Sequence, residues 1–190
     1  FKIIVDSCCD LPAALRGDPQ VVSVPLTIRV GEHTVVDDAT FDQADLLWRM
    51  KECPSAPSTS CPSPADYLAA FAGEAEELYV VALSALLSGS HNSAAQARRL
   101  YLEEHPRSRV HVFNSCSASA GETLVARKIW ELASSGVPFS DVVSQTSRYI
   151  DQMQTLFVLE NLDNLRNNGR LSRLQNLVTG AFGVKLLMGS

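Results

Sequence analysis

The sequence predicts an α/β fold: a parallel sheet with helices on both faces. Short apolar runs rich in β-branched residues alternate along the chain with segments whose apolar residues recur at helical spacing. This alternation is typical of parallel strands joined by helical crossovers. Hydrophobic residues make up 46% of the 190 residues and charged residues 19%, so the chain has enough apolar material for a sizeable core.

The first part of the chain predicts two extended segments and a helix. Residues 2–7 (KIIVDS) form a short apolar run that predicts a buried strand, and residues 21–30 (VVSVPLTIRV) predict a second extended segment. Gly31 and Glu32 follow and favour a hairpin turn. Residues 41–50 carry apolar side chains at helical spacing and predict a helix.

Residues 57–67, PSTSCPSPADY, crowd four hydroxyl side chains, a thiol and three prolines into one stretch. Ser63 suits an N-cap, Pro64 the first helical position and Asp66 the first turn. We therefore expect a short helix from this point to Gly73, with the hydroxyl cluster at its start. A helix N-terminus offers free N–H groups and a partial positive charge, which favour an anion.

The middle of the chain continues the alternation. Residues 77–84 predict a central strand, residues 90–105 a helix and residues 109–115 another strand. Ser119 and Glu122 have the spacing of a capping box, which predicts that a long helix begins there.

The last part of the chain predicts a further helix and two strands. Residues 140–153 predict a helix that Ser140 caps, and residues 155–161 and 184–188 predict strands.

Charge and composition exclude several classes of function. The net charge of −5 argues against broad binding to nucleic acid or to anionic membranes. No apolar run is long enough to span a bilayer, and the start, FKIIVDS, lacks the features of a signal peptide. A cytoplasmic protein, expected to be a monomer, is the simplest interpretation.

The cysteine and histidine patterns predict neither disulfides nor a metal site. The cysteines are odd in number and show no C-x-x-C spacing, and the histidines lack the spacing of metal ligands. We expect reduced thiols and no metal or cofactor. The five cysteines are Cys8, Cys9, Cys53, Cys61 and Cys116.

Hydroxyl-rich loops follow three of the predicted strands: DSCCD, SALLSGSHNS and NSCSASAGE. With PSTSCPSPADY they make four such loops, each leading into a helix. Because ligands of parallel sheets bind outside the carboxyl ends of the strands, the four loops are expected to converge on one site. The alternative is that each loop only caps its helix.

The chemistry of these loops favours binding over catalysis. They contain no Rossmann, P-loop or nucleophile-elbow motif. One loop carries two carboxylates, which could act as a catalytic pair. However, Asp6 closes a strand and Asp10 is placed to cap the first helix, so a structural role is favoured for both. Neutral hydroxyl and N–H donors hold a carboxylate or a phosphate without a strong charge, which suits a carrier that passes its ligand on.

Six segments together resemble the DegV family of bacterial fatty-acid-binding proteins over the whole chain. They are KIIVDSCCDLP, VPLTIRVGEH, PSTSCPSPADY, LSALLSGSHNSA, NSCSASAGE and NNGRLS. The resemblance implies a non-catalytic lipid carrier that binds one long-chain fatty acid. It also implies that a separate fatty acid kinase phosphorylates the bound acid for phospholipid synthesis.

The motifs of that family assign roles to individual residues. Thr59 of PSTSCPS and Ser88 of LSGS match the positions that bind the carboxylate, and Arg170 of GRLS matches an arginine that faces the kinase. The neighbouring polar positions, from the same loops, are candidates for the shell around the head group: Ser7, Ser60, Gly89 and Ser115.

The chain departs from the family pattern at two of these motifs. Cys61 stands where the family usually has glutamine, and Asn114 stands where many members have aspartate. The resemblance implies an N-terminal α/β domain with the ligand loops over residues 1–153 and the beginning of a C-terminal α+β domain over residues 154–190, where the chain is expected to be incomplete. It also implies that family members extend past the position that matches Ser190, and that this further part holds most of the second domain and a histidine that meets the carboxylate.

Two other functions remain open from the sequence. The fold is related to subunits of dihydroxyacetone kinases, so an enzyme acting on a small phosphorylated or carbonyl metabolite is the first. A thiol-based sensor is the second, because four cysteines lie in the predicted site loops, where a helix N-terminus lowers the pKa of a thiol. These are Cys8, Cys9, Cys61 and Cys116.

Overall fold

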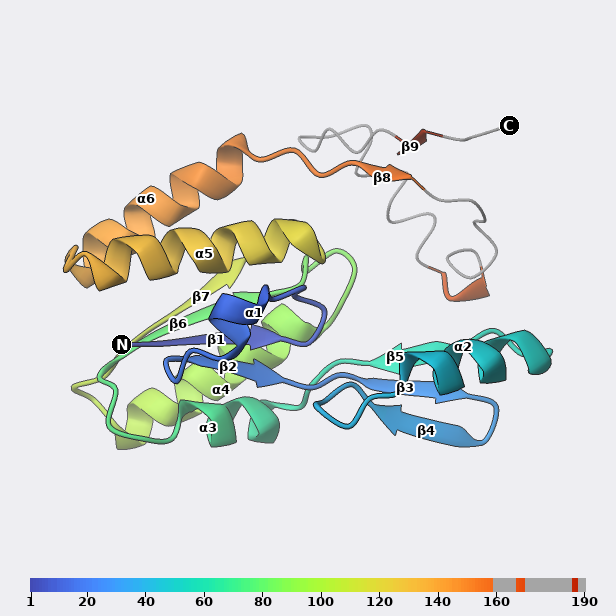
Figure 1. Ribbon diagram of the computed structural model, residues 1–190. Coiled ribbons are helices and arrows are strands. Elements are labelled where there is room, and N and C mark those ends of the chain that lie inside the picture. Colours follow the sequence, from blue (N-terminus) through green and yellow to red (C-terminus); the bar gives the residue numbers. More distant parts are fainter. Residues whose placement is uncertain (159–166, 170–185, 188–190) are drawn as a thin grey trace. The chain divides into compact units, whose positions relative to one another are not determined.

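The computed structural model describes residues 1–158, 167–169 and 186–187, and these residues fall into two compact units (Figure 1). Unit 1 comprises Phe1–Pro25 and Cys61–Met153, and unit 2 comprises Leu26–Ser60 and Gln154–Ser190. Each unit is described by itself below.

Unit 1 is built on a four-stranded sheet in the order β2-β1-β6-β7, in which every neighbouring pair is parallel. The two central strands consist almost entirely of buried residues, as expected for strands covered on both faces. The strands are β1 (Lys2–Asp6), β2 (Val21–Val24), β6 (Glu77–Ala82) and β7 (Arg109–Asn114).

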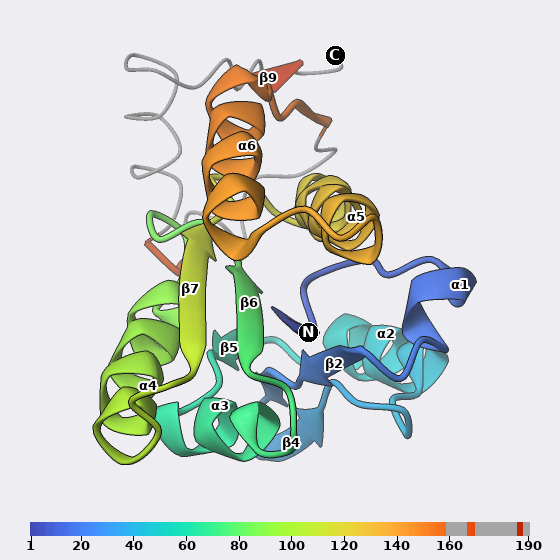
Figure 2. The same cartoon turned by 90° about the vertical axis from the view of Figure 1, so that its left-hand side faces the viewer.

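One face of this sheet is covered by α1 (Ala13–Arg16), α5 (Ala120–Ser134) and α6 (Phe139–Gln152) (Figure 2). Alternate residues of the central strands, such as Ile3 and Val5, point into this layer because side chains of a strand alternate between faces. The buried helix residues that meet them include Leu15, Val125, Ala126, Ile129, Val142 and Ile150.

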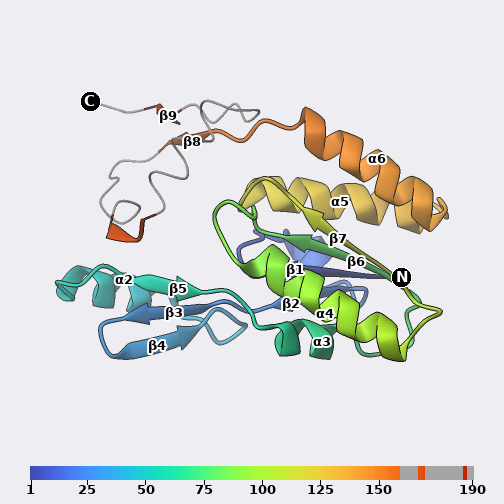
Figure 3. The ribbon, with the colours of Figure 1, turned by 180° about the vertical axis from the view of Figure 1, so that it is seen from behind.

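The other face is covered by α3 (Pro64–Phe71) and α4 (Ser90–Glu104) (Figure 3). Ile4 points to this side from β1. Small residues on α4 let that helix lie close to the sheet, while α3 supplies large aromatic rings. The helix residues of this second core are Tyr67, Phe71, Ala94, Ala97 and Tyr101. The predicted parallel sheet with helices on both faces is therefore confirmed.

Two predicted helix starts are confirmed and one is wrong. Ser63 caps α3 in a reciprocal capping box with Asp66, and Pro64 occupies the first helical position. Glu122 likewise closes a capping box at the start of α5. In contrast, α6 begins at Phe139, and Pro138 rather than the predicted Ser140 occupies its N-cap position.

Unit 2 contains an antiparallel sheet in the order β4-β3-β5 and the helix α2 (Gln43–Glu52), which Asp42 caps. The predicted hairpin is present: β3 (Thr27–Val30) pairs with β4 (His33–Val36), and Gly31 takes a positive φ of 59° in the turn. The third strand is β5 (Ser58–Ser60). Two short parallel strands, β8 (Phe157–Val158) and β9 (Leu186–Leu187), also belong to this unit.

The predicted single extended segment 21–30 is wrong. It contains two strands, because Pro25, which has no backbone N–H, separates β2 of unit 1 from β3 of unit 2. Residues 26–60, which the family resemblance assigns to the first domain, group with unit 2. The boundary between residues 153 and 154 stays a prediction. None of the helices that the structure describes combines the length and apolar character needed to cross a bilayer.

Candidate functional site

The polar loops of unit 1 meet at the carboxyl edge of its sheet. The chain leaves β1 toward β2 on one side and later returns to β6 on the other, so the strand order reverses between β1 and β6. Parallel sheets bind their ligands outside such a reversal. Asp6 is the last residue of β1 and lies at this point, with no exposed surface.

The Asp6 carboxylate connects the elements at this edge. Its Oδ1 accepts a hydrogen bond from the Cys8 N–H at 3.2 Å, and its Oδ2 accepts from the Leu83 N–H at 2.9 Å and from the Ser90 hydroxyl at 2.5 Å. Ser90 in turn lies 2.6 Å from the Tyr67 hydroxyl of α3. These bonds hold the starts of two loops and the N-terminus of α4 around one buried carboxylate.

Ser88 lies half-buried in the loop between β6 and α4. Its Oγ accepts a hydrogen bond from the Ser90 N–H at 3.2 Å, so it satisfies one free donor of the helix start. No acceptor for the Ser88 hydroxyl proton is found among the residues that the structure describes. A hydroxyl both accepts and donates, so Ser88 keeps a proton to donate.

The loop after β7 is fastened to the loop after β6. The Ser84 N–H donates to the Ser117 carbonyl at 2.9 Å, and the Ala85 N–H donates to Asn114 Oδ1 at 3.0 Å. Ser115 is fully buried and its hydroxyl donates to the Ser117 carbonyl at 3.1 Å. Asn114 thus fulfils a structural role as a hydrogen-bond acceptor, which an aspartate at this position would also provide.

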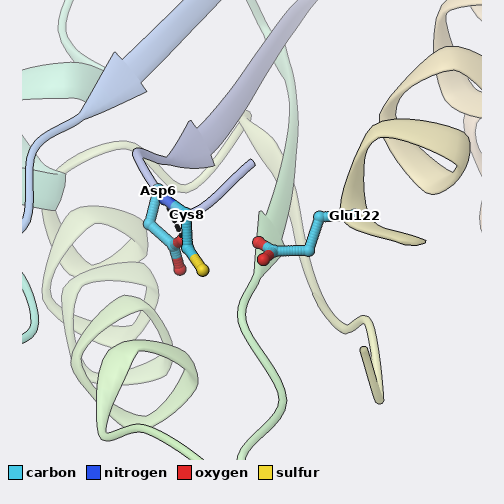
Figure 4. A group of neighbouring side chains, drawn as sticks. All are labelled: Asp6, Cys8 and Glu122. Carbon is cyan, nitrogen blue, oxygen red and sulfur yellow. Dashed lines mark hydrogen bonds between the residues drawn. The ribbon is translucent and has the colours of Figure 1, made fainter. Parts of the chain in front are cut away.

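Asp6, Cys8 and Glu122 form a cluster at the same edge (Figure 4). Glu122 lies in the first turn of α5, is fully buried and accepts a hydrogen bond from the Ser119 N–H at 3.2 Å. Burial, and next the negative charge of Asp6, raise the pKa of the Glu122 carboxyl to about 10. Burial also raises the pKa of Asp6, against the opposing effect of its hydrogen bonds.

The thiols of these loops are held in their neutral form. Burial, and next the nearby Glu122 and Asp6 charges, raise the pKa of Cys8 to about 12. Burial also raises the pKa of Cys9 to about 12 and that of Cys116 above its usual value. The thiolate is the reactive form of cysteine, so these three sites do not favour thiol reactivity.

Asp10 does not cap the first helix, in contrast to the expectation from the sequence; the N-cap position of α1 is Pro12. Instead, Asp10 accepts a hydrogen bond from the Ser119 hydroxyl, and its carbonyl accepts from the Thr123 hydroxyl at 2.8 Å. Ser119 has a positive φ of 56°, which is uncommon outside glycine. Asp10 therefore fastens the loop after β1 to the start of α5.

The predicted site residues fall in both units. Ser7, Ser88, Gly89 and Ser115 belong to unit 1, in the loops just described, whereas Thr59 and Ser60 are exposed residues of β5 in unit 2. Cys61, the next residue after β5, lies in unit 1, and its Sγ is 3.9 Å from the Ser93 hydroxyl of α4. Arg170 lies outside the described residues.

The partnership of Asp6 with Glu122 was missed by sequence reasoning. Glu122 has the spacing of a capping residue, and Asp6 ends a buried strand, so each has a sufficient local explanation. One signal was available. The helix that contains Glu122 follows β7, and the carboxyl ends of β1 and β7 lie at the same edge of a parallel sheet.

Similar sequences and a similar fold occur in known proteins. The DegV family model, described as that of an uncharacterised protein family, matches residues 1–189. A DegV domain-containing protein of Streptococcus gordonii is 40% identical over 189 residues, which are 98% of this chain and 67% of that protein.

Two solved structures are similar to this chain. A DegV-family protein of Ruminococcus gnavus, described with vaccenic acid, has a TM-score of 0.88 and 45% identity, covering 90% of this chain and 61% of that one. The Fatty Acid Kinase (Fak) B3 protein of Streptococcus pneumoniae, loaded with linoleic acid, has a TM-score of 0.84 and 42% identity, covering 93% and 63%. The chain thus spans less than two thirds of each of these structures. The match over nearly every residue shows that this chain belongs to the DegV family.

Proposed function

We propose that the protein binds a long-chain fatty acid and presents its carboxylate to a separate fatty acid kinase, without catalysing a reaction itself. The observation that carries this proposal is the Ser88 hydroxyl, which accepts from the helix start and keeps its proton to donate. Two family members of 45% and 42% identity, described with vaccenic and linoleic acid, support the choice of ligand.

The proposed head-group site consists of neutral donors. Thr59 and Ser88 bind the carboxylate, and the hydroxyl and backbone groups of Ser7, Ser60 and Gly89 surround it. Each hydrogen bond to a charged group contributes roughly 1.5–3 kcal/mol. Ser115 belongs to the proposed shell around the head group as a residue that holds its loop in place. Its own hydroxyl donates to the Ser117 carbonyl.

The acyl chain supplies most of the affinity in this proposal. Burying one methylene contributes about 0.8 kcal/mol, so a chain of roughly fifteen methylenes offers about 12 kcal/mol before the costs of ordering. Neutral donors then orient the carboxylate without binding it so tightly that a kinase cannot reach it. Arg170 is the proposed kinase-facing residue.

The raised pKa values of three of the four loop thiols disfavour these three as redox sensors. A redox-sensing thiol needs a lowered pKa. Burial raises the pKa of Cys8 and Cys9 to about 12 and that of Cys116 in the same direction.

Hydroxyl deletion tests the proposed site in the full-length protein. Thr59→Val and Ser88→Ala should each weaken fatty-acid binding by about 1.5–3 kcal/mol, or roughly ten- to a hundredfold in Kd. The double variant should lose less than the sum, because both hydroxyls bind one carboxylate. Phosphorylation of the bound acid by a fatty acid kinase should fall further, since a misplaced reacting group costs on the order of a hundredfold in rate.

Ser58→Ala is the matched control, because it removes an exposed hydroxyl from the same strand as Thr59. It should leave binding and phosphorylation unchanged. If Thr59→Val and Ser88→Ala lower the melting temperature but leave binding and turnover intact, both hydroxyls serve only local structure and the assignment is wrong.

A further inference from the structure

Three potential metal ligands, two of them close in the sequence and the third far along the chain, come together beside the loop after β1. They are a carboxylate at the end of β1, a thiol in the following loop and a carboxylate in the first turn of α5. Ligand atoms of Asp6, Cys8 and Glu122 all lie within 4.8 Å of one another. Figure 4 shows the Glu122 side chain directed at the other two.

One oxygen of Glu122 faces this cluster. Oε1 accepts from the Ser119 N–H, whereas among the described residues no donor with hydrogen-bond geometry reaches Oε2, which is fully buried beside the Asp6 carboxyl and the Cys8 thiol. Buried carboxylate oxygens are normally satisfied. In the described part of the chain, neither Asp6 nor Glu122 takes part in an ion pair with a lysine, arginine or histidine. A shared proton or a bound cation would therefore neutralise the cluster, because no cationic side chain among the described residues does so.

We propose that Asp6, Cys8 and Glu122 form a binding site for a divalent zinc ion. Zinc accepts both thiolate and carboxylate ligands, and its sites with three protein ligands keep a fourth position for water or another group. Zn–S and Zn–O bonds of about 2.3 and 2.0–2.2 Å place tetrahedral ligand atoms roughly 3.5 Å apart. Adjustments of about 1 Å would bring the three atoms of the cluster to this spacing.

The surroundings of the cluster fit a metal site in two further respects. Metal-ligating groups are usually oriented by outer hydrogen bonds. The Cys8 N–H, the Leu83 N–H and the Ser90 hydroxyl hold Asp6, and the Ser119 N–H holds Glu122. Cys8 is only partly buried, which gives an ion a route from solvent and leaves room for the fourth ligand.

A proton is the competitor of the metal at this site. With Glu122 and Cys8 protonated, binding of Zn²⁺ releases one proton from the carboxyl and one from the thiol, and the three anionic ligands then face one dication. The mutual repulsion of the negative ligand charges favours a cation, because an ion of charge two reverses the local electrostatics.

Metal titration of the full-length protein tests this site. The protein is first stripped with a chelator and reduced, and Zn²⁺ is then added in competition with a chelating dye. We expect one equivalent to bind and to raise the melting temperature. Co²⁺ in place of Zn²⁺ should show thiolate-to-cobalt charge-transfer absorption, which reports the sulfur ligand directly.

Glu122→Gln keeps the shape of the side chain but removes the anionic ligand, and Cys8→Ser removes the sulfur. Each should weaken Zn²⁺ binding by more than about tenfold, and Cys8→Ser should abolish the charge-transfer band. Cys116→Ser, which alters a half-buried thiol on a neighbouring loop, should change neither.

Two results would overturn the proposal. One is the absence of stoichiometric binding, with the cluster neutralised by a shared proton only. The other is Zn²⁺ binding that persists in both Cys8→Ser and Glu122→Gln, which would assign the ion to other thiols. Melting temperatures of the metal-free variants show that each is folded, and fatty-acid binding is measured separately, so failure of this site leaves the lipid proposal standing.

Discussion

Ionisable side chains in unit 1 are buried in positions where their charge state affects stability. His111 of β7 is one of them: it is half-buried, and the charged or titratable groups that act on it are Arg98 and His91 of α4. Burial, and next the charges of Arg98 and His91, lower the pKa of His111 below 6.5. Burial also lowers the pKa of His91.

We predict that His111→Gln makes the protein less sensitive to mild acid. Because the pKa of His111 is lowered by folding, the unfolded chain binds a proton first as the pH falls below about 6.5. The stability that the neutral imidazole contributes at pH 7 is then lost progressively as the pH falls. Between about pH 7 and pH 5.5, chemical denaturation should therefore show a smaller loss of unfolding free energy for the variant than for the wild type.

His91→Gln should act in the same direction, and the double variant should be less acid-sensitive than either single one. Wild-type and His111→Gln stability curves that run parallel over this pH range would show that His111 is not held neutral by its surroundings.

Local sequence signals predicted the residues whose partners are near in the chain. Ser63 and Asp66 form the expected capping box because the interaction spans a single turn. The contacts of Asp6 with Ser90 and of Asp10 with Ser119 depend on which strands become neighbours. A sequence pattern that identifies a strand does not specify the neighbour of that strand, so these contacts were not predictable.

At the scale of elements, α5 shows how one helix separates a core face from a solvent face. Ile129 has no exposed surface and packs in the core with Val125 and Ala126, whereas Leu124 of the same helix is 46% exposed. The helix also carries Trp130, whose indole N–H donates to Asp18 at 2.8 Å.

We predict that Ile129→Ala destabilises unit 1 by about 2–5 kcal/mol, since it removes buried methyl and methylene groups and leaves a cavity. Leu124→Ala, the matched control on the exposed face, should cost less than about 1 kcal/mol. Urea unfolding followed by Trp130 fluorescence in a Trp48→Phe background reports on unit 1, because Trp48 belongs to unit 2. Equal effects of the two substitutions would show that α5 does not cover the sheet through its Ile129 face.

Apolar patterns predicted most elements, and the errors occur at prolines. Pro25 divides the apolar run 21–30 between two sheets, and Pro138 rather than Ser140 occupies the N-cap position of α6. A periodic pattern records which side chains are apolar but not where the backbone changes direction. Both errors therefore come from main-chain geometry that hydrophobic periodicity does not contain.

At the scale of the whole molecule, alternation of strands and helices correctly predicted the parallel sheet of unit 1. It did not predict that residues 26–60 would leave that unit between β2 and α3 and group with residues 154–190. This grouping depends on contacts between segments far apart in the sequence. The candidate carboxylate-binding residues are affected directly, since Thr59 belongs to one unit and Ser88 to the other.

Chain length of the ligand distinguishes a lipid carrier from an enzyme for small metabolites. If the acyl tail supplies the affinity, each methylene removed from a saturated fatty acid should cost about 0.8 kcal/mol, or roughly fourfold in Kd. Displacement of a fluorescent fatty acid from the delipidated full-length protein measures this series. The long-chain alcohol of equal length is the control, because it keeps the tail but offers the hydroxyl donors no charge.

We expect the alcohol to bind more weakly than the acid by only about ten- to a hundredfold, the contribution of one or two hydrogen bonds to a charged group. The tail would then outweigh the head group, which is what a carrier needs in order to release its carboxylate to a kinase. The opposite result would be affinity that does not change with chain length and disappears with the carboxylate. It would show that the hydroxyl-rich loops bind a small anion by themselves, and the lipid proposal would have to give way to an enzyme acting on such a metabolite.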